Sequence, residues 1–190
     1  MANDRTLYAP WGTVTPRFWH HEHSPAPAAL APADAVPAVE VPPPPEEYRE
    51  RIAAITAALA PPHDPRRLTA ADTDAAQLDG EFTARYGDTH THTVQIRELR
   101  GWTAHLKGEP ATAARWYLHT TGLQAQIWGA HHALTKASAH RAVQHWNGIT
   151  DPADRLTVGA ELLPMLTAVT GQDSTAYRTV HTAVGTGRTS

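Results

Sequence analysis

An internal repeat of 42 residues constrains this chain more than any other feature of its sequence. Gly87, Gly129 and Gly171 follow one another at intervals of 42 residues. Around the first two, each copy carries an aromatic residue, then Gly, then His three positions on and Thr six positions on. The acid–Pro–Ala triplets that begin at Glu109 and Asp151 have the same spacing. Such a period is typical of arrays that repeat one supersecondary unit.

The residues that recur predict one helix–turn–helix unit per period. A glycine after an apolar stretch supplies the left-handed conformation that ends a helix. Thr93 and Thr135 follow these glycines, and we expect them to cap the next helix through its free amides. Asp151 precedes a proline and an acidic first turn, which is typical of a helix start.

Apolar residues recur at three and four in the second half of each period, which indicates one packed face of a helix. In the middle unit they are Ala113, Trp116, Tyr117, Thr120, Leu123 and Ile127, and one period later Leu156, Leu162, Leu163, Leu166 and Val169. No segment alternates as a strand does. We also predict a preceding helix pair over 46–60 and 68–86, and a terminal helix from 172 to about 184.

Residues 97–109, with the positions that follow them, resemble a tetratricopeptide repeat. The resemblance places a small residue at Gly101, where two helices approach closely, and a turn glycine at Gly108. In the second helix it places a small residue at Ala113 and an aromatic at Tyr117. The 42-residue period is similar to the longer variant of kinesin light chains and of many bacterial proteins.

The resemblance implies an all-α fold: a right-handed α-solenoid of about three helix–turn–helix repeats with a C-terminal capping helix, over residues 46–190. It is good for 87–128 and fair for 129–171. The third unit departs from the family pattern at Val143 and Arg155, where small residues are usual, and at Gly159 in place of the aromatic.

The resemblance also implies a groove lined by the first helix of each pair, where a partner peptide or helix binds. Trp102 would be its anchor, because an exposed Trp on such a face supplies large contact area; packing on a neighbouring unit or under the N-terminal arm is the alternative. The implied groove residues are Gln95, Glu98, Trp102 and His105 of the middle unit and Ala137, His140, Gln144 and Asn147 of the next.

Residues 1–45 form a proline-rich arm before the helical domain. Ten of the sixteen prolines lie there, which excludes a helix or central strand and favours a flexible, polyproline II-like spacer over 24–45. Near the start of the arm, four aromatics lie in a stretch with neither a helical nor a strand period. These four residues are Tyr8, Trp11, Phe18 and Trp19. They could pack on the protein's own surface, form a motif that anchors to a partner protein, or lie in a disordered segment.

Composition excludes several classes of function. There is no cysteine, which removes disulfides, thiolate nucleophiles and zinc–thiolate sites. A net charge of -3 argues against a nucleic-acid partner, which normally requires a basic surplus on one face. No apolar run is long enough to span a bilayer, and no secretion signal begins the chain, so we expect a cytoplasmic protein.

The thirteen histidines do not by themselves predict a metal site. His20, His21, Glu22 and His23 are ligand types, but consecutive residues in a proline-flanked coil do not converge on one ion. His90 and His132 occupy equivalent places in the repeat, so a bond to the turn backbone explains both. No nucleophile elbow, phosphate loop or pair of acids predicts catalysis, and no cofactor is expected.

These observations predict a non-enzymatic adaptor or scaffold whose partner is another protein. The alternative is a regulatory or structural subunit that is ordered by a larger enzyme or secretion assembly. A ligand-binding helical protein that uses its histidines is a third reading. Self-association, and docking of the N-terminal arm into the chain's own groove, also stay open.

Overall fold

A computed structural model of the protein describes residues 43–187. Within them the chain is all-helical, with seven helices and no strand, as the sequence predicts. The aromatic residues Tyr8, Trp11, Phe18 and Trp19 lie outside the described residues. The helices are α1 (Glu46–Ala58), α2 (Pro65–Tyr86), α3 (Thr91–Leu106), α4 (Pro110–Trp128), α5 (Ala133–Asn147), α6 (Pro152–Val169) and α7 (Thr175–Gly187).

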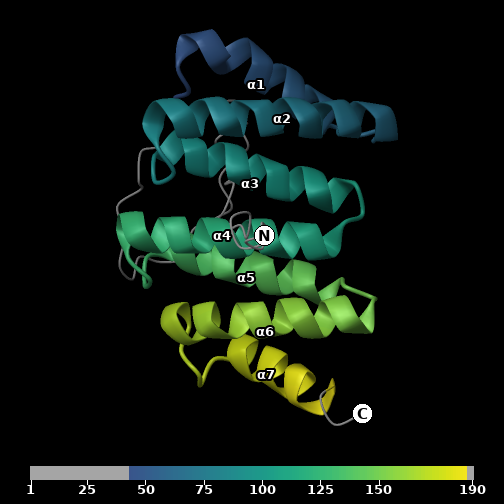
Figure 1. The fold of residues 1–190 in the computed structure, drawn as a ribbon, viewed down its shortest axis with the longest axis vertical. Coiled ribbons are helices and arrows are strands. Elements are labelled where there is room, and N and C mark those ends of the chain that lie inside the picture. The colour runs from purple at the N-terminus through teal and green to yellow at the C-terminus, as the bar shows by residue number, and fades with distance from the viewer. Residues whose placement is uncertain (1–42, 188–190) are drawn as a thin grey trace, which may run out of the picture.

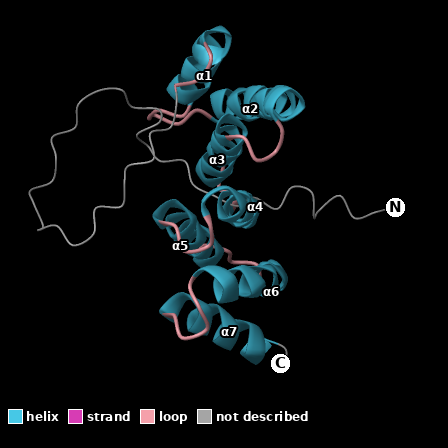
Figure 2. Cartoon of the chain, turned by 90° about the vertical axis from the view of Figure 1, so that its left-hand side faces the viewer, coloured by secondary structure: helices cyan, strands magenta, loops and turns pink. Residues whose placement is uncertain are grey.

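The helices stack in chain order, from α1 at the top of Figure 1 to α7 at the bottom. Each one packs on the next, and α4 and α5 also contact α6 and α7, respectively. Seen from the side in Figure 2, the odd-numbered helices form one layer, on the left, and the even-numbered helices form the other. These two sets are the odd layer and the even layer.

Three glycines with positive φ punctuate the stack at the predicted period. Gly87 and Gly129 cap the C-termini of α2 and α4, with φ of 85° and 91°, and Gly171 follows α6 with φ of 81°. An L side chain is strained in this conformation, so glycine is the residue that lets the chain reverse here. The prediction that these glycines end the helices is confirmed.

Histidine, rather than threonine, caps the helices that follow. The imidazole Nδ1 of His90 accepts the backbone amide two residues on at 3.2 Å, and His132 does the same at 3.3 Å. Thr93 and Thr135 instead donate from Oγ1 to the carbonyl of the preceding turn glycine, at 2.8 and 3.0 Å. The predicted threonine caps are therefore wrong, because both threonines lie inside the first helical turn. The predicted backbone role of the two histidines is confirmed.

The other predicted boundaries hold within a few residues. Asp151 caps α6 by accepting the amide of Asp154 at 2.8 Å, as expected. Helix α1 ends at Ala58 rather than at 60, and α2 begins three residues early because Asp64 caps it and proline occupies its first position. The terminal helix α7 runs to Gly187.

Two close helix approaches shape the core. A Cβ on Gly101 of α3 would lie 3.1 Å from Trp116 Cβ and 3.2 Å from the Tyr117 ring of α4, which confirms the predicted close contact. In the next unit a Cβ on Gly159 would lie 3.1 Å from Nε1 of the fully buried Trp146. The third unit therefore reverses the roles of the two helices: in the middle unit the first helix supplies the glycine and the second the aromatic side chain, whereas here α5 supplies the aromatic side chain and α6 the glycine.

Candidate binding surface

Four ring side chains form a continuous ladder from the surface of the odd layer into the core. Trp102, 41% exposed, lies on α3 with its ring 5.0 Å from that of His105, measured between centroids. The His105 ring lies 4.8 Å from His145 of α5, which in turn stacks on Tyr117 of α4 at 5.0 Å and 12°. Three helices thus share one run of rings, which fixes the position of the exposed Trp.

The two inner rings of the ladder are electrically neutral. Burial, with His105 and Arg141 nearby, lowers the pKa of His145 to about 4, so the ring is uncharged at pH 7. Burial, helped by the neighbouring Glu98, raises the pKa of the Tyr117 hydroxyl. Arg141 donates a hydrogen bond to that hydroxyl. The ladder is therefore an apolar support, and its polar edge faces Arg141.

A buried polar cluster lies behind the ladder. Glu98 of α3 is 2% exposed and accepts a hydrogen bond from Gln124 Nε2 of α4 at 3.2 Å. Burial raises its pKa well above the ordinary value, and Arg141 opposes that shift. Gln124 Oε1 accepts no hydrogen bond within the described part of the chain. A protonated Glu98 has a donor to offer this cluster, which a carboxylate lacks.

The predicted groove residues divide between surface and interior. Gln95 and Glu98 are 5% and 2% exposed and lie inside the stack, so neither offers a surface to a partner. Gln95 Oε1 instead lies 3.5 Å from Nδ1 of the buried His92. The others are exposed, on α3 and α5: Trp102, His105, Ala137, His140, Gln144 and Asn147. The ring contact between His105 and His145 brings the α3 and α5 residues to one face.

A second polar cluster, which sequence reasoning missed, joins α2, α3 and α4. The carboxylate of Asp79 accepts from Arg97 Nε at 2.8 Å and from Arg100 NH1 at 2.6 Å. Arg97 also donates to Asp88 at 2.6 Å, and its NH1 lies 3.1 Å from His119 Nε2. Burial, followed by Arg97, lowers the pKa of His119 to about 4. Because these charged groups pair with one another, the cluster joins the three helices and is not a binding site.

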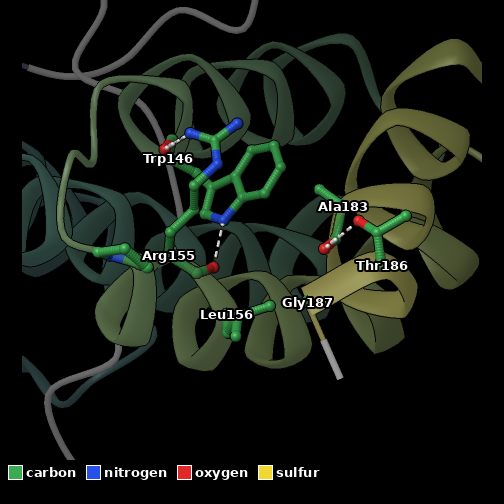
Figure 3. Close-up of a pocket in the computed structure, with 7 residues that line it drawn as sticks. Trp146, Arg155, Leu156, Ala183, Thr186 and Gly187 are labelled. Carbon is green, nitrogen blue, oxygen red and sulfur yellow. Dashed lines mark hydrogen bonds between the residues drawn. The ribbon is translucent and has the colours of Figure 1, made fainter. Parts of the chain in front are cut away.

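A hollow near the C-terminal end offers no comparable chemistry (Figure 3). Trp146 Nε1 donates to the Arg155 carbonyl at 2.8 Å, and Arg155 NH1 returns a bond to the Trp146 carbonyl at 3.2 Å. The guanidinium also stacks on the Trp146 ring at 4.1 Å. Leu156, Ala183 and Gly187 complete the wall. The hollow is therefore a joint between helices whose polar groups satisfy one another.

The described residues hold neither a metal centre nor a membrane span. No three His, Asp or Glu side chains among residues 43–187 converge on a point where an ion could bind. The cluster from His20 to His23 lies outside that range. None of the described helices combines the length and apolar character needed to cross a bilayer. The chain matches no protein-family model, no curated protein and no solved structure.

Proposed function

We propose that the chain is a non-enzymatic adaptor that binds a peptide or helix of a partner protein on the face of α3 and α5. In this proposal the seven helices are a right-handed, tetratricopeptide-like solenoid. The support is the repeated chemistry of its turns. Two histidine caps and two threonine–glycine bonds recur 42 residues apart with matching partners and nearly equal lengths.

Trp102 is the observation that carries the proposal. Among the described residues it is the one large hydrophobic side chain that stays exposed. It is not a loose surface residue, because His105 and the rings behind it hold its position. Preordered aromatic side chains dominate the binding energy of many interfaces, and truncating one commonly costs about 2 kcal/mol or more. That cost corresponds to roughly a 30-fold loss of affinity.

The ends of the stack favour a self-standing adaptor over a subunit that a larger assembly must order. The exposed residues of α1 include Glu46, Glu47, Arg49 and Glu50, and those of α7 include Arg178. The buried residues of these two helices, such as Ile55 and Val184, pack inward on the stack. Terminal helices with polar outer residues keep a repeat array in solution without a partner.

Affinity capture from the source organism tests the proposal. The bait is the tagged full chain, and the test variant is the double substitution Trp102→Ala, Gln144→Ala on the odd layer. The matched control is Gln77→Ala, Gln126→Ala, which changes two exposed residues of the even layer. We expect a partner that the control retains and the test variant loses, with equal thermal midpoints for both. If the test variant still captured the partner, the binding site would have to lie elsewhere than on α3 and α5.

A further inference from the structure

Three helices of the odd layer, α3, α5 and α7, are almost free of acidic residues, whereas α1 carries Glu46, Glu47 and Glu50. Glu98 is the single Asp or Glu within α3, α5 and α7, and it is buried. In contrast, α2 alone contains four acids, namely Asp72, Asp74, Asp79 and Glu81. The negative charge of the described helices is thus concentrated outside the face that carries Trp102.

An exposed positive charge lies on α5. Lys136 is exposed on α5, and no ion pair within residues 43–187 involves it. Arg141, half-buried and five residues further along α5, points inward instead and hydrogen-bonds the buried Tyr117 hydroxyl. On the even layer, by comparison, Arg115 forms a bidentate salt bridge with Glu161, with N–O distances of 2.9 and 3.1 Å. A ligand charge that meets Lys136 therefore displaces no internal partner among the described residues.

Burial favours the neutral form of the one acid within α3 and α5. Because the pKa of Glu98 is raised well above its ordinary value, the neutral acid is favoured there. The nearby rings of His105 and His140 are exposed and can donate hydrogen bonds through a ring N–H. The exposed residues of α3 and α5 therefore include hydrogen-bond donors, one fixed positive charge and one aromatic anchor.

We infer that the segment docking on the face of α3 and α5 is an acidic peptide that carries one large apolar side chain. The inference rests on the proposed function and names the chemistry of its partner. The apolar side chain packs on Trp102, while a carboxylate meets Lys136. A single-stranded nucleic acid would also satisfy an aromatic–cation surface. The overall charge of -3 disfavours it, because phosphate chains need a larger basic surplus.

Fluorescence anisotropy with the full chain tests the inference. The labelled probes are three synthetic peptides of equal length with one Trp each: the first is rich in Glu, the second has Gln in place of every Glu, and the third has Lys. A fourth probe is oligothymidylate. The variants are Lys136→Glu on the face, Arg66→Glu as the matched charge reversal in α2, and Trp102→Ala. Both Lys136 and Arg66 are exposed, so each reversal leaves the core intact.

We expect the Glu peptide to bind at least about tenfold more tightly than the Gln peptide at low salt, and to lose that margin as salt is raised. Lys136→Glu should remove most of the margin, Arg66→Glu little of it, and Trp102→Ala should weaken the Glu and Gln peptides alike. Equal binding of the Glu and Gln peptides would overturn the inference and leave the proposed adaptor function standing. Tighter binding of oligothymidylate, or no binding of any peptide, would also overturn it. The capture experiment judges the adaptor function separately.

Discussion

We expect two glycines in neighbouring helices to respond oppositely to replacement by alanine. Gly80 lies inside α2, and nothing lies within 4 Å of where its Cβ would be. Gly101 lies inside α3, where a Cβ would meet Trp116 Cβ at 3.1 Å and the Tyr117 ring at 3.2 Å. Trp116 Cβ is attached directly to the backbone of α4, so it cannot rotate away. Relief of the contact requires a shift of the whole helix.

The magnitude follows from two opposing effects. Replacing an interior helix glycine with alanine gains about 1 kcal/mol of stability, through the greater helix propensity of alanine. Gly80→Ala should realise this gain. At Gly101 the same gain is opposed by overpacking, which costs about 1–3 kcal/mol in a filled core. We therefore expect Gly101→Ala to be less stable than Gly80→Ala by about 2 kcal/mol and to fall below the wild type.

Equilibrium unfolding in urea, followed by far-ultraviolet circular dichroism on the full chain, measures both variants. Linear extrapolation gives each free energy of unfolding, and equal slopes verify that the extent of unfolding is unchanged. Gly101→Val extends the series, because two more methyl groups must fit in the same gap. The close approach of α3 and α4 would be refuted if Gly101→Ala stabilised the protein as much as Gly80→Ala does.

Three further substitutions test the interior and the turns. The folded pKa of His145 is about 4, below the value of 6.5 for an unperturbed histidine, so the unfolded chain binds its proton first as pH falls. This group should lower stability on the order of 3 kcal/mol between pH 6.5 and 4. His145→Phe, which keeps a ring on Tyr117, should remove that contribution in urea titrations at each pH and leave the decline due to His119, whose pKa is also about 4. Asp79→Asn leaves the buried Arg97 and the partly buried Arg100 without their shared carboxylate and should cost about 3 kcal/mol, measured by the same urea titration. Thr135→Val keeps the shape but removes the donor to the Gly129 carbonyl, so we expect a loss of about 1 kcal/mol and a lower midpoint of thermal unfolding.

The turns of this fold are predictable from the sequence because their chemistry is local. A positive φ at Gly129 and a first-position proline after Asp151 depend on a few neighbouring residues, so the pattern of residue types locates them. The choice between His132 and Thr135 as the cap was harder. Both carry an acceptor near the helix start, and only the geometry of the turn shows that the hydroxyl faces back to the glycine carbonyl.

The surface was predictable in part, and the polar interior was not. The resemblance to a tetratricopeptide repeat implies that Trp102 and Gln144 face a partner, and both are exposed. It implies the same for Glu98, yet Glu98 is buried. Its partner Gln124 lies 26 residues away, on another helix. A long-range pairing of polar side chains leaves no periodic trace in one sequence, which is also why the cluster around Asp79 escaped prediction.

The buried polar pairs limit how far neighbouring helices can slide past one another. The facing surfaces of α3 and α4 include small residues such as Ala113, and smooth apolar surfaces allow several alignments of similar energy. A slip of α4 by one turn, about 5.4 Å, would separate Gln124 from Glu98 and leave both enclosed without a partner. Each buried polar group stranded in this way costs about 1–3 kcal/mol. We expect these contacts to fix the alignment of neighbouring helices, so that a chain of nearly interchangeable units assembles in one register.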